Sequence, residues 1–289
     1  MDIISTLKYR WATGSMLLRI IFINVGVFLL LHIISLILLA FGTDAEAALR
    51  YIEFPSSIEI WLTTPWTVIT YMFSQYDFFH LLFNMLWLYW FGEIFLFADT
   101  PKRLLSLYIY GGIGGALLFM LCYIAAGSFG FLIGSSAAVI AIVTATAIRH
   151  PDYRVGLLFL GDISLKWLAI ITIAIDFISI GGSNAGGHIA HIGGAIVGAI
   201  YAVMQKKGHD ITAPFNALID SIVNMCRRIS IRRKPSVKTP PEPQKPSAGI
   251  NKNDEKRLDE ILDKVKRSGY GALSAEEKKQ LFDVSNRIK

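Results

Sequence analysis

The chain has 289 residues, of which 53% are hydrophobic and only 17% charged, whereas soluble globular domains carry about 25% charged residues. The charges are unevenly distributed. Residues 1–205 contain 9 Lys/Arg and 11 Asp/Glu, and residues 206–289 contain 19 Lys/Arg and 11 Asp/Glu. This composition excludes a soluble enzyme with one core and a disordered protein. It predicts a membrane domain followed by a soluble basic tail.

Six apolar segments are candidates for membrane-spanning helices, because about 20 apolar residues suffice to cross a bilayer. The fourth and fifth are short, and short spans are tolerated inside a bundle whose neighbours cover their ends. The predicted fold class is therefore an all-α membrane protein, a six-helix bundle followed by a small helical tail. The segments are residues 17–42, 78–97, 104–127, 136–149, 165–180 and 186–205.

The distribution of basic residues predicts the orientation of these helices. If the N-terminus is inside, the outside segments contain Arg50 as their only cation. Both termini, and with them the basic tail, are then expected to be cytoplasmic. The cations of the inside segments are Lys8, Arg10, Lys102, Arg103, Arg149, Arg154, Lys206 and Lys207.

Polar residues inside membrane spans are costly and are therefore candidates for a functional site. Three of the segments begin at the outer face and carry polar side chains in their first two turns. At 1.5 Å per residue, these side chains lie within roughly 10 Å of the outer boundary. They are His80 and Asn84 in the second segment, Ser135 and Ser136 in the fourth, and His188 and His191 in the sixth.

The chemistry that this set permits is acyl transfer. Ser136 follows a glycine turn and opens a helix, where free N–H groups can stabilise an oxyanion. His80 and Asn84 share a helix face at i, i+4 and can donate to the same oxyanion. His191 can take the Ser136 proton and return it to the leaving amine. Because no carboxylate is suitably placed in the spans, we expect a Ser–His dyad.

Three motifs resemble those of the rhomboid intramembrane serine proteases. Gly134-Ser135-Ser136-Ala137 resembles the Gly-x-Ser-x nucleophile motif, and His80-x-x-x-Asn84 matches the oxyanion motif of the family's second helix. Residues 190–198, AHIGGAIVG, are similar to the Ala-His-x-x-Gly-x-x-x-Gly motif of its sixth helix. The motifs occur in the family's order, and the resemblance covers about residues 15–205.

The resemblance implies a six-helix rhomboid fold at residues 17–205 that cleaves single-pass membrane proteins at or just inside the outer leaflet. Ser136 is then the nucleophile and His191 the general base and acid. The oxyanion hole is formed by the Ser136 backbone N–H, His80 and Asn84. The substrate enters between the second and fifth spans. No metal or cofactor is implied, and the expected location is a bacterial cytoplasmic membrane.

Three positions depart from the family's pattern. Ala137 follows the nucleophile where the family usually has Gly. Ile140 stands where some members place an aromatic that stacks on the catalytic imidazole, so His191 must be held in another way. Thr67 replaces the arginine of the family's Trp-Arg pair, in Pro65-Trp66-Thr67. None of these departures removes a member of the expected dyad.

Each candidate residue also has an alternative interpretation. Ser136 taken alone is typical of a helix N-cap, and His80 and Asn84 could simply cross-link helices. Ser135 is expected to cap the helix and His188 to be solvated, while Asp176 is not assigned to the site. At the level of the whole chain, the alternatives are a catalytically silent rhomboid-like adaptor that binds transmembrane helices, or a small-solute transporter.

Residues 1–16 are expected to be a short cytoplasmic N-terminus. The basic tail, residues 206–289, divides into three parts. Residues 206–234 predict an amphipathic helix on an anionic inner leaflet, because an apolar stripe that begins at Phe215 is followed by a basic cluster. The expected partner of the cluster is therefore the membrane and not a nucleic acid. Residues 235–250 predict a Pro-rich linker. Residues 251–289 predict a helical hairpin with a capping box from Ser274 to Glu277 and an unknown partner.

Overall fold

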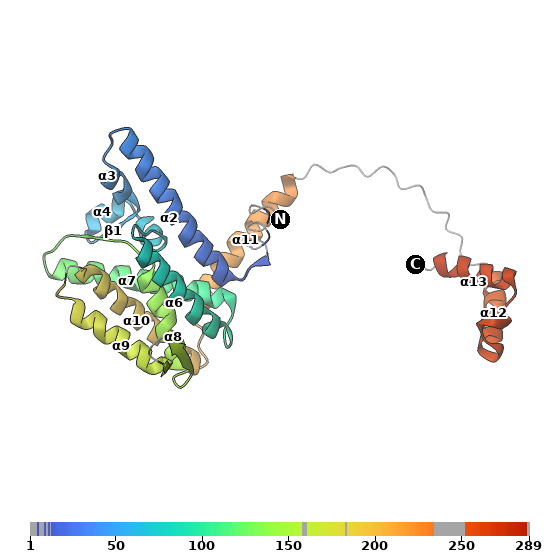
Figure 1. The fold of residues 1–289 in the computed structure, drawn as a ribbon. Helices are drawn as coiled ribbons and strands as arrows, with labels where there is room; N and C mark the ends of the chain where they lie inside the picture. The colour runs from blue at the N-terminus through green and yellow to red at the C-terminus, as the bar shows by residue number, and fades with distance from the viewer. Residues whose placement is uncertain are drawn as a thin grey trace. The chain divides into compact units, whose positions relative to one another are not determined.

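The computed structural model describes residues 5, 9, 11, 13–157, 161–182, 184–233 and 252–287. The chain divides into two units, Met1–Arg227 and Arg228–Lys289, which we describe separately (Figure 1). The first unit contains the apolar helices, and the second contains a pair of polar helices.

Each of the six apolar segments forms a helix. Among the described residues, four helices are long and apolar enough to cross a membrane: α2, α6, α7 and α10. Because α8 and α9 have only 14 and 15 residues, the count of six membrane spans stays a prediction. The helices are α2 (Met16–Ala40), α6 (Phe78–Leu96), α7 (Pro101–Ala125), α8 (Ser136–Arg149), α9 (Leu165–Ser179) and α10 (Ala185–Lys206).

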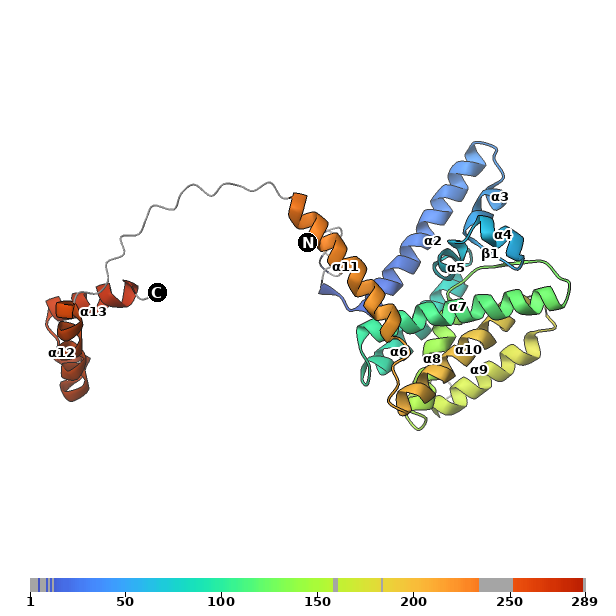
Figure 2. The same ribbon diagram turned by 180° about the vertical axis from the view of Figure 1, so that it is seen from behind.

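The short helix α8 lies among its neighbours, with α7 and α10 packed most extensively against it (Figures 1 and 2). Residues 137–147 of α8 are all buried. A Cβ at Gly194 or Gly198 of α10 would overlap the backbone oxygen of Ala137 or Ala141, so the two helices meet at backbone contact. This enclosure explains how a 14-residue helix is tolerated, since protein rather than lipid surrounds it.

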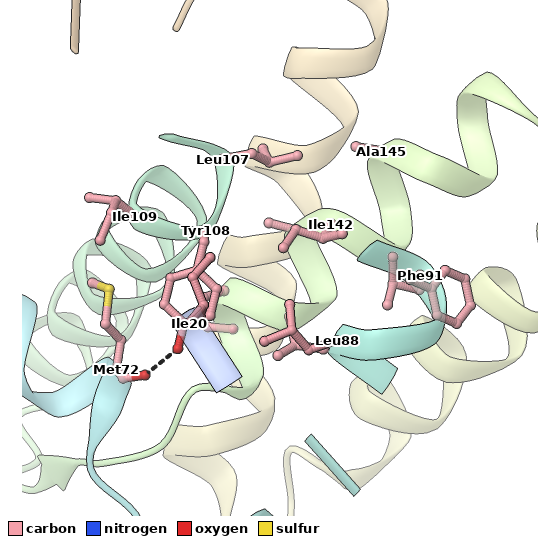
Figure 3. Close-up of a cluster of buried hydrophobic side chains, with 14 of the residues drawn as sticks. Ile20, Met72, Leu88, Phe91, Leu107, Tyr108, Ile109, Ile142 and Ala145 are labelled. Carbon is pink, nitrogen blue, oxygen red and sulfur yellow. Dashed lines mark hydrogen bonds between the residues drawn. The ribbon is translucent and has the colours of Figure 1, made fainter. Parts of the chain in front are cut away.

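A buried hydrophobic cluster joins α2, α6, α7 and α8 to the segment that precedes α6 (Figure 3). Two fully buried tyrosines place their hydroxyls within it. Tyr108 donates to the Met72 carbonyl at 2.7 Å, and Tyr71 donates to the Gly112 carbonyl at 2.5 Å. Because each buried hydroxyl has a partner, the cluster carries no desolvation penalty from them. The bonds also fasten the segment around residue 72 to α7.

The segment between α2 and α6 supports the chain just before α8. Its strand β1 (Phe54–Pro55) pairs antiparallel with β2 (Phe131–Leu132), and the Gly134 N–H donates to the Tyr71 carbonyl at 3.0 Å. The turn that leads into α8 is therefore held by hydrogen bonds from the segment between α2 and α6. The remaining elements of the segment are α3 (Ala45–Leu49), η1 (Arg50–Ile52), α4 (Ile58–Thr63), α5 (Thr67–Thr70) and η2 (Tyr71–Phe73).

A second small sheet connects α8 to α9. Strands β3 (Arg154–Leu157) and β4 (Gly161–Ser164) form an antiparallel pair. The structure is mostly helical, as predicted, but these two short sheets depart from a strictly all-α fold. Strands of two to four residues are too short to show the alternating pattern by which a strand is detected in sequence.

Asp99 joins the ends of three helices at one face of the unit, which we call the basic face. Its side chain is fully buried and accepts hydrogen bonds from Arg103 at 3.0 Å, from Arg149, and from the Tyr201 hydroxyl at 2.7 Å. These donors come from α7, α8 and α10. A buried carboxylate is tolerated only when it is paired in this way. Asp99 therefore fixes three helices at one point.

The predicted amphipathic helix after the bundle is α11 (Ala213–Arg233). Its first turns pack on α7, where Asn216 accepts from Ser106 at 2.8 Å and Asp220 pairs with Lys102 at 2.6 Å. Part of its apolar stripe, including Leu218, stays exposed. The side chains of the basic cluster and the Pro-rich linker predicted at 235–250 lie outside the described residues, so the boundaries 206–234 and 235–250 stay predictions.

The second unit is the predicted hairpin, built from α12 (Lys252–Ser268), η3 (Tyr270–Ala272) and α13 (Ala275–Arg287). The capping box is confirmed. The Ser274 N–H donates to Glu277 at 2.7 Å, and the Glu277 N–H donates to the Ser274 hydroxyl at 3.3 Å. Lys264 of α12 reaches Glu277 at 2.8 Å and, together with the Ser274 N–H, holds the pKa of Glu277 below its usual value.

We predict that Asp99→Ala destabilises the membrane unit by about 3 kcal/mol, because it leaves Arg103 and Arg149 without their shared partner. The measurement is thermal unfolding of the full chain in detergent. The matched control is Asp152→Ala, which removes an exposed ion pair with Lys166 and should leave the melting temperature near that of the parent chain. Equal melting temperatures for the two variants would contradict the role of Asp99.

Candidate active site

The four side chains expected to act together meet at one pocket of about 210 Å³. His80 and Asn84 reach it from α6, Ser136 from the first turn of α8, and His191 from α10. The face of the unit on which these helices begin is called the site face below. The other lining residues are Phe83, Trp87, Val139, Ile140, Thr172 and Asp176.

The turn before α8 presents Ser136 to the pocket. Gly134 has φ +122°, a conformation that favours glycine. A Cβ at this position would lie 3.3 Å from His80 Cε1 and 3.8 Å from Ser136 Oγ. Glycine is therefore needed both for the turn and for the close approach of the His80 ring. As the first residue of α8, Ser136 also has its backbone N–H at a helix N-terminus.

Asn84 is held by a residue that the sequence analysis missed. Asn84 Nδ2 donates to Gln75 Oε1 at 2.8 Å, and Gln75 Nε2 donates to Ser135 Oγ at 3.2 Å. An amide nitrogen carries two hydrogens, so one remains available to the pocket. Ser135 is the N-cap residue of α8, as predicted, but its side chain makes no capping hydrogen bond, and its buried hydroxyl accepts from Gln75 instead.

His191 is hydrogen-bonded to a carboxylate. His191 Nδ1 lies 2.7 Å from Asp176 Oδ1 of α9, and Asp176 is buried. An ionised carboxylate only accepts, so His191 donates from Nδ1 and keeps the lone pair of a neutral ring on Nε2. The expectation that no carboxylate is suitably placed is therefore wrong. A signal for Asp176 was present, because it is an acid at the same membrane depth as the other polar groups.

His188 shares the same carboxylate oxygen. Its Nδ1 lies 2.8 Å from Asp176 Oδ1, and its side chain is 22% exposed. The expectation that His188 is simply solvated is therefore wrong. The second carboxylate oxygen of Asp176, Oδ2, is buried and has no hydrogen-bond partner among the described residues.

The structure also accounts for two of the three departures from the family's pattern. Ile140 and His191 both line the pocket. The hydrogen bond to Asp176 holds the imidazole of His191 in place, as a stacked aromatic is expected to do in some family members. Trp66 Nε1 donates to the Tyr51 carbonyl at 2.8 Å, and the buried Thr67 hydroxyl donates to the Thr64 carbonyl at 2.7 Å. The segment before α6 is thus anchored without the arginine.

Comparisons with known proteins point to one family. Residues 63–207, half of the chain, match the Rhomboid domain family model, and residues 251–287 match a family of unknown function, DUF6576. The chain is 35% identical over 158 residues to RHOMBOID-like protein 12, mitochondrial, of Arabidopsis thaliana. It is 28% identical over 145 residues to Presenilin-associated rhomboid-like protein A, mitochondrial, of Danio rerio, and 25% identical over 142 residues to Presenilin-associated rhomboid-like protein, mitochondrial, of Bos taurus.

These alignments cover 49%, 48% and 48% of this chain but 47%, 36% and 37% of the respective relatives. The chain therefore spans less than half the length of these relatives. Their names contradict the prediction of a bacterial cytoplasmic membrane with cytoplasmic termini, since all three are mitochondrial. The physical reason for the error is that a bias of basic residues distinguishes the two faces of a membrane but does not identify the membrane.

Proposed function

This chain belongs to the rhomboid family, and on that premise we propose that it is an intramembrane serine endopeptidase. The observation that carries the proposal is the single pocket lined by the Ser136 hydroxyl and by His191, whose ring is oriented by Asp176. Its substrates are single-pass transmembrane proteins, cut near the site face.

Ser136 acts as the nucleophile. Its Oγ attacks the scissile carbonyl carbon while its proton moves to His191 Nε2. His191 then gives this proton to the leaving amine. When the amine departs, an acyl group remains on Ser136. Water attacks the acyl group in the second half of the reaction, with His191 again as the base. Asp176 accepts from Nδ1 throughout and stabilises the imidazolium that forms in each half.

The developing oxyanion is stabilised by donors from two helices. The Ser136 backbone N–H lies at the start of α8, while His80 and the free hydrogen of Asn84 Nδ2 come from α6. Donors fixed in advance in a site of low dielectric stabilise the transition state without reorganising. Gln75 is a positioning residue in this scheme, because it accepts one hydrogen of the Asn84 amide and does not itself line the pocket.

The substrate reaches Ser136 between α6 and α9. Phe83 and Trp87 of α6 line one side of the pocket, and Thr172 and Asp176 of α9 line the other. A helical substrate buries its carbonyls in its own hydrogen bonds, so the scissile segment must unwind before Ser136 can attack. This requirement favours substrates with small or helix-breaking residues near the cut.

The tail serves membrane attachment rather than chemistry. The exposed Leu218 and Ile222 of α11 precede a basic cluster in the sequence, and this pattern suits an anionic membrane surface at the basic face. The hairpin of the second unit has its own ion pair and capping box and is free to serve an unidentified partner.

We predict that Ser136→Ala and His191→Ala abolish both cleavage of a single-pass substrate and labelling by a fluorophosphonate, because each removes half of the nucleophile–base pair. The measurement uses the full chain in liposomes. Ser135→Ala should keep labelling, since that hydroxyl is buried against Gln75.

Thr144→Val is the matched control, because it also removes a hydroxyl from α8. The Thr144 hydroxyl has no hydrogen-bond partner among the described residues. It should leave cleavage and labelling unchanged. Labelling that survives Ser136→Ala but disappears in Ser135→Ala would overturn the choice of nucleophile. A parent chain that binds substrate but shows neither labelling nor cleavage would favour the silent adaptor.

We predict that Asp176→Asn lowers kcat by about a hundredfold or more with little change in KM, because the neutral amide no longer enforces the Nδ1–H form of His191. Steady-state cleavage separates these parameters, and thermal unfolding checks that the variant folds. Asp162→Asn, which changes an exposed acid of β4, serves as the control. A rise in KM with an unchanged kcat would contradict a positioning role for Asp176.

A further inference from the structure

We propose that Asp176, His188 and His191 form a binding site for a divalent zinc ion, and that zinc bound there inhibits the enzyme. The inhibition rests on the proposed protease function, whereas the binding does not. Each residue offers one ligand atom, and the three atoms all lie within 4.8 Å of one another.

Two helices build this constellation. His188 and His191 are three residues apart on α10 and therefore share one of its faces. Their rings are nearly perpendicular, at 83°, with centroids 5.8 Å apart. Both Nδ1 atoms contact the same oxygen of Asp176, which α9 brings to this face of α10. Two imidazole nitrogens and a carboxylate thus converge on one point.

One carboxylate oxygen of Asp176 is available as a further metal ligand. Asp176 is only 5% exposed, and its Oδ2 has no hydrogen-bond partner among the described residues. An acceptor buried in this way is costly unless something binds it. The carboxylate would offset half of the charge of a divalent cation held by the two histidines, through either of its oxygens.

Zinc fits the donors and their spacing. It is bound by imidazole nitrogen and carboxylate oxygen at about 2.1 Å, and tetrahedral ligands then lie about 3.4 Å apart. The two Nδ1–Oδ1 distances, 2.8 and 2.7 Å, need to open by about 0.6 to 0.7 Å to reach this ligand spacing. The side chains of His188 and His191 are 22% and 16% exposed, so an ion and one water can reach the fourth position.

Zinc at this site removes the general base by changing the tautomer of His191. To bind the metal, Nδ1 must present its lone pair, so a neutral ring carries its proton on Nε2 instead. The proton lost from Nδ1 is replaced on Nε2 through solvent, and the net charge of the ring is unchanged. A protonated Nε2 cannot accept the Ser136 proton, so the nucleophile is not activated.

Binding is tested on the tag-free, full-length Ser136→Ala protein, which needs no activity. Calorimetry with zinc, and the visible absorption of cobalt as a spectroscopic substitute, should both report one ion per chain. Adding His188→Gln or Asp176→Asn should weaken binding by about tenfold or more, with folding checked by thermal unfolding. The control His209→Ala removes a histidine of the loop after α10 and should bind zinc like the parent protein.

Inhibition is tested on the active chain, with each variant compared to its own rate in a chelator. Zinc should inhibit the parent chain and His209→Ala equally, and His188→Gln should need about tenfold more zinc. Zinc binding that is absent from the Ser136→Ala protein, or unchanged by His188→Gln, would overturn the site. Binding with unaltered cleavage would overturn the inhibition and leave the protease proposal intact.

Discussion

The site depends on how closely the backbones of α8 and α10 approach each other. Lipid supplies no hydrophobic drive between helices, so helices associate by close packing of small faces. Gly194 and Gly198 allow this contact because any side chain there would overlap the backbone of α8. Ser136 is the first residue of α8, and His191 lies three residues before Gly194 on α10. The packing contact therefore also sets the position of Ser136 relative to His191.

Two sets of hydrogen bonds then orient the groups that the packing brings together. On one side of the pocket, Gln75 links Asn84 to Ser135; on the other, Asp176 links His191 to His188. In an interior of low dielectric these bonds are strong, and an unpaired group would be costly. The orienting residues come from the segment before α6 and from α9, neither of which carries Ser136 or His191.

Hydropathy and motif spacing were enough to predict the helices and the four pocket residues. The second apolar segment, 78–97, became α6 at Phe78–Leu96, because an apolar run in lipid has few alternatives to a helix. Gln75 was missed because loop residues follow no period. Asp176 was not assigned to the site although it is an acid inside an apolar segment, because its contact with His191 depends on packing between α9 and α10.

The location of one proton on His191 connects the proposed catalysis with the proposed metal binding. With Asp176 accepting from Nδ1, the lone pair of the ring points away from the carboxylate and can serve Ser136. The same carboxylate, with His188 beside it, makes Nδ1 a good metal ligand once its proton has moved. The hydrogen bond to Asp176 thus gives His191, the proposed general base, a fixed tautomer, and in the proposed zinc-bound state the same contact is the place where that tautomer is lost.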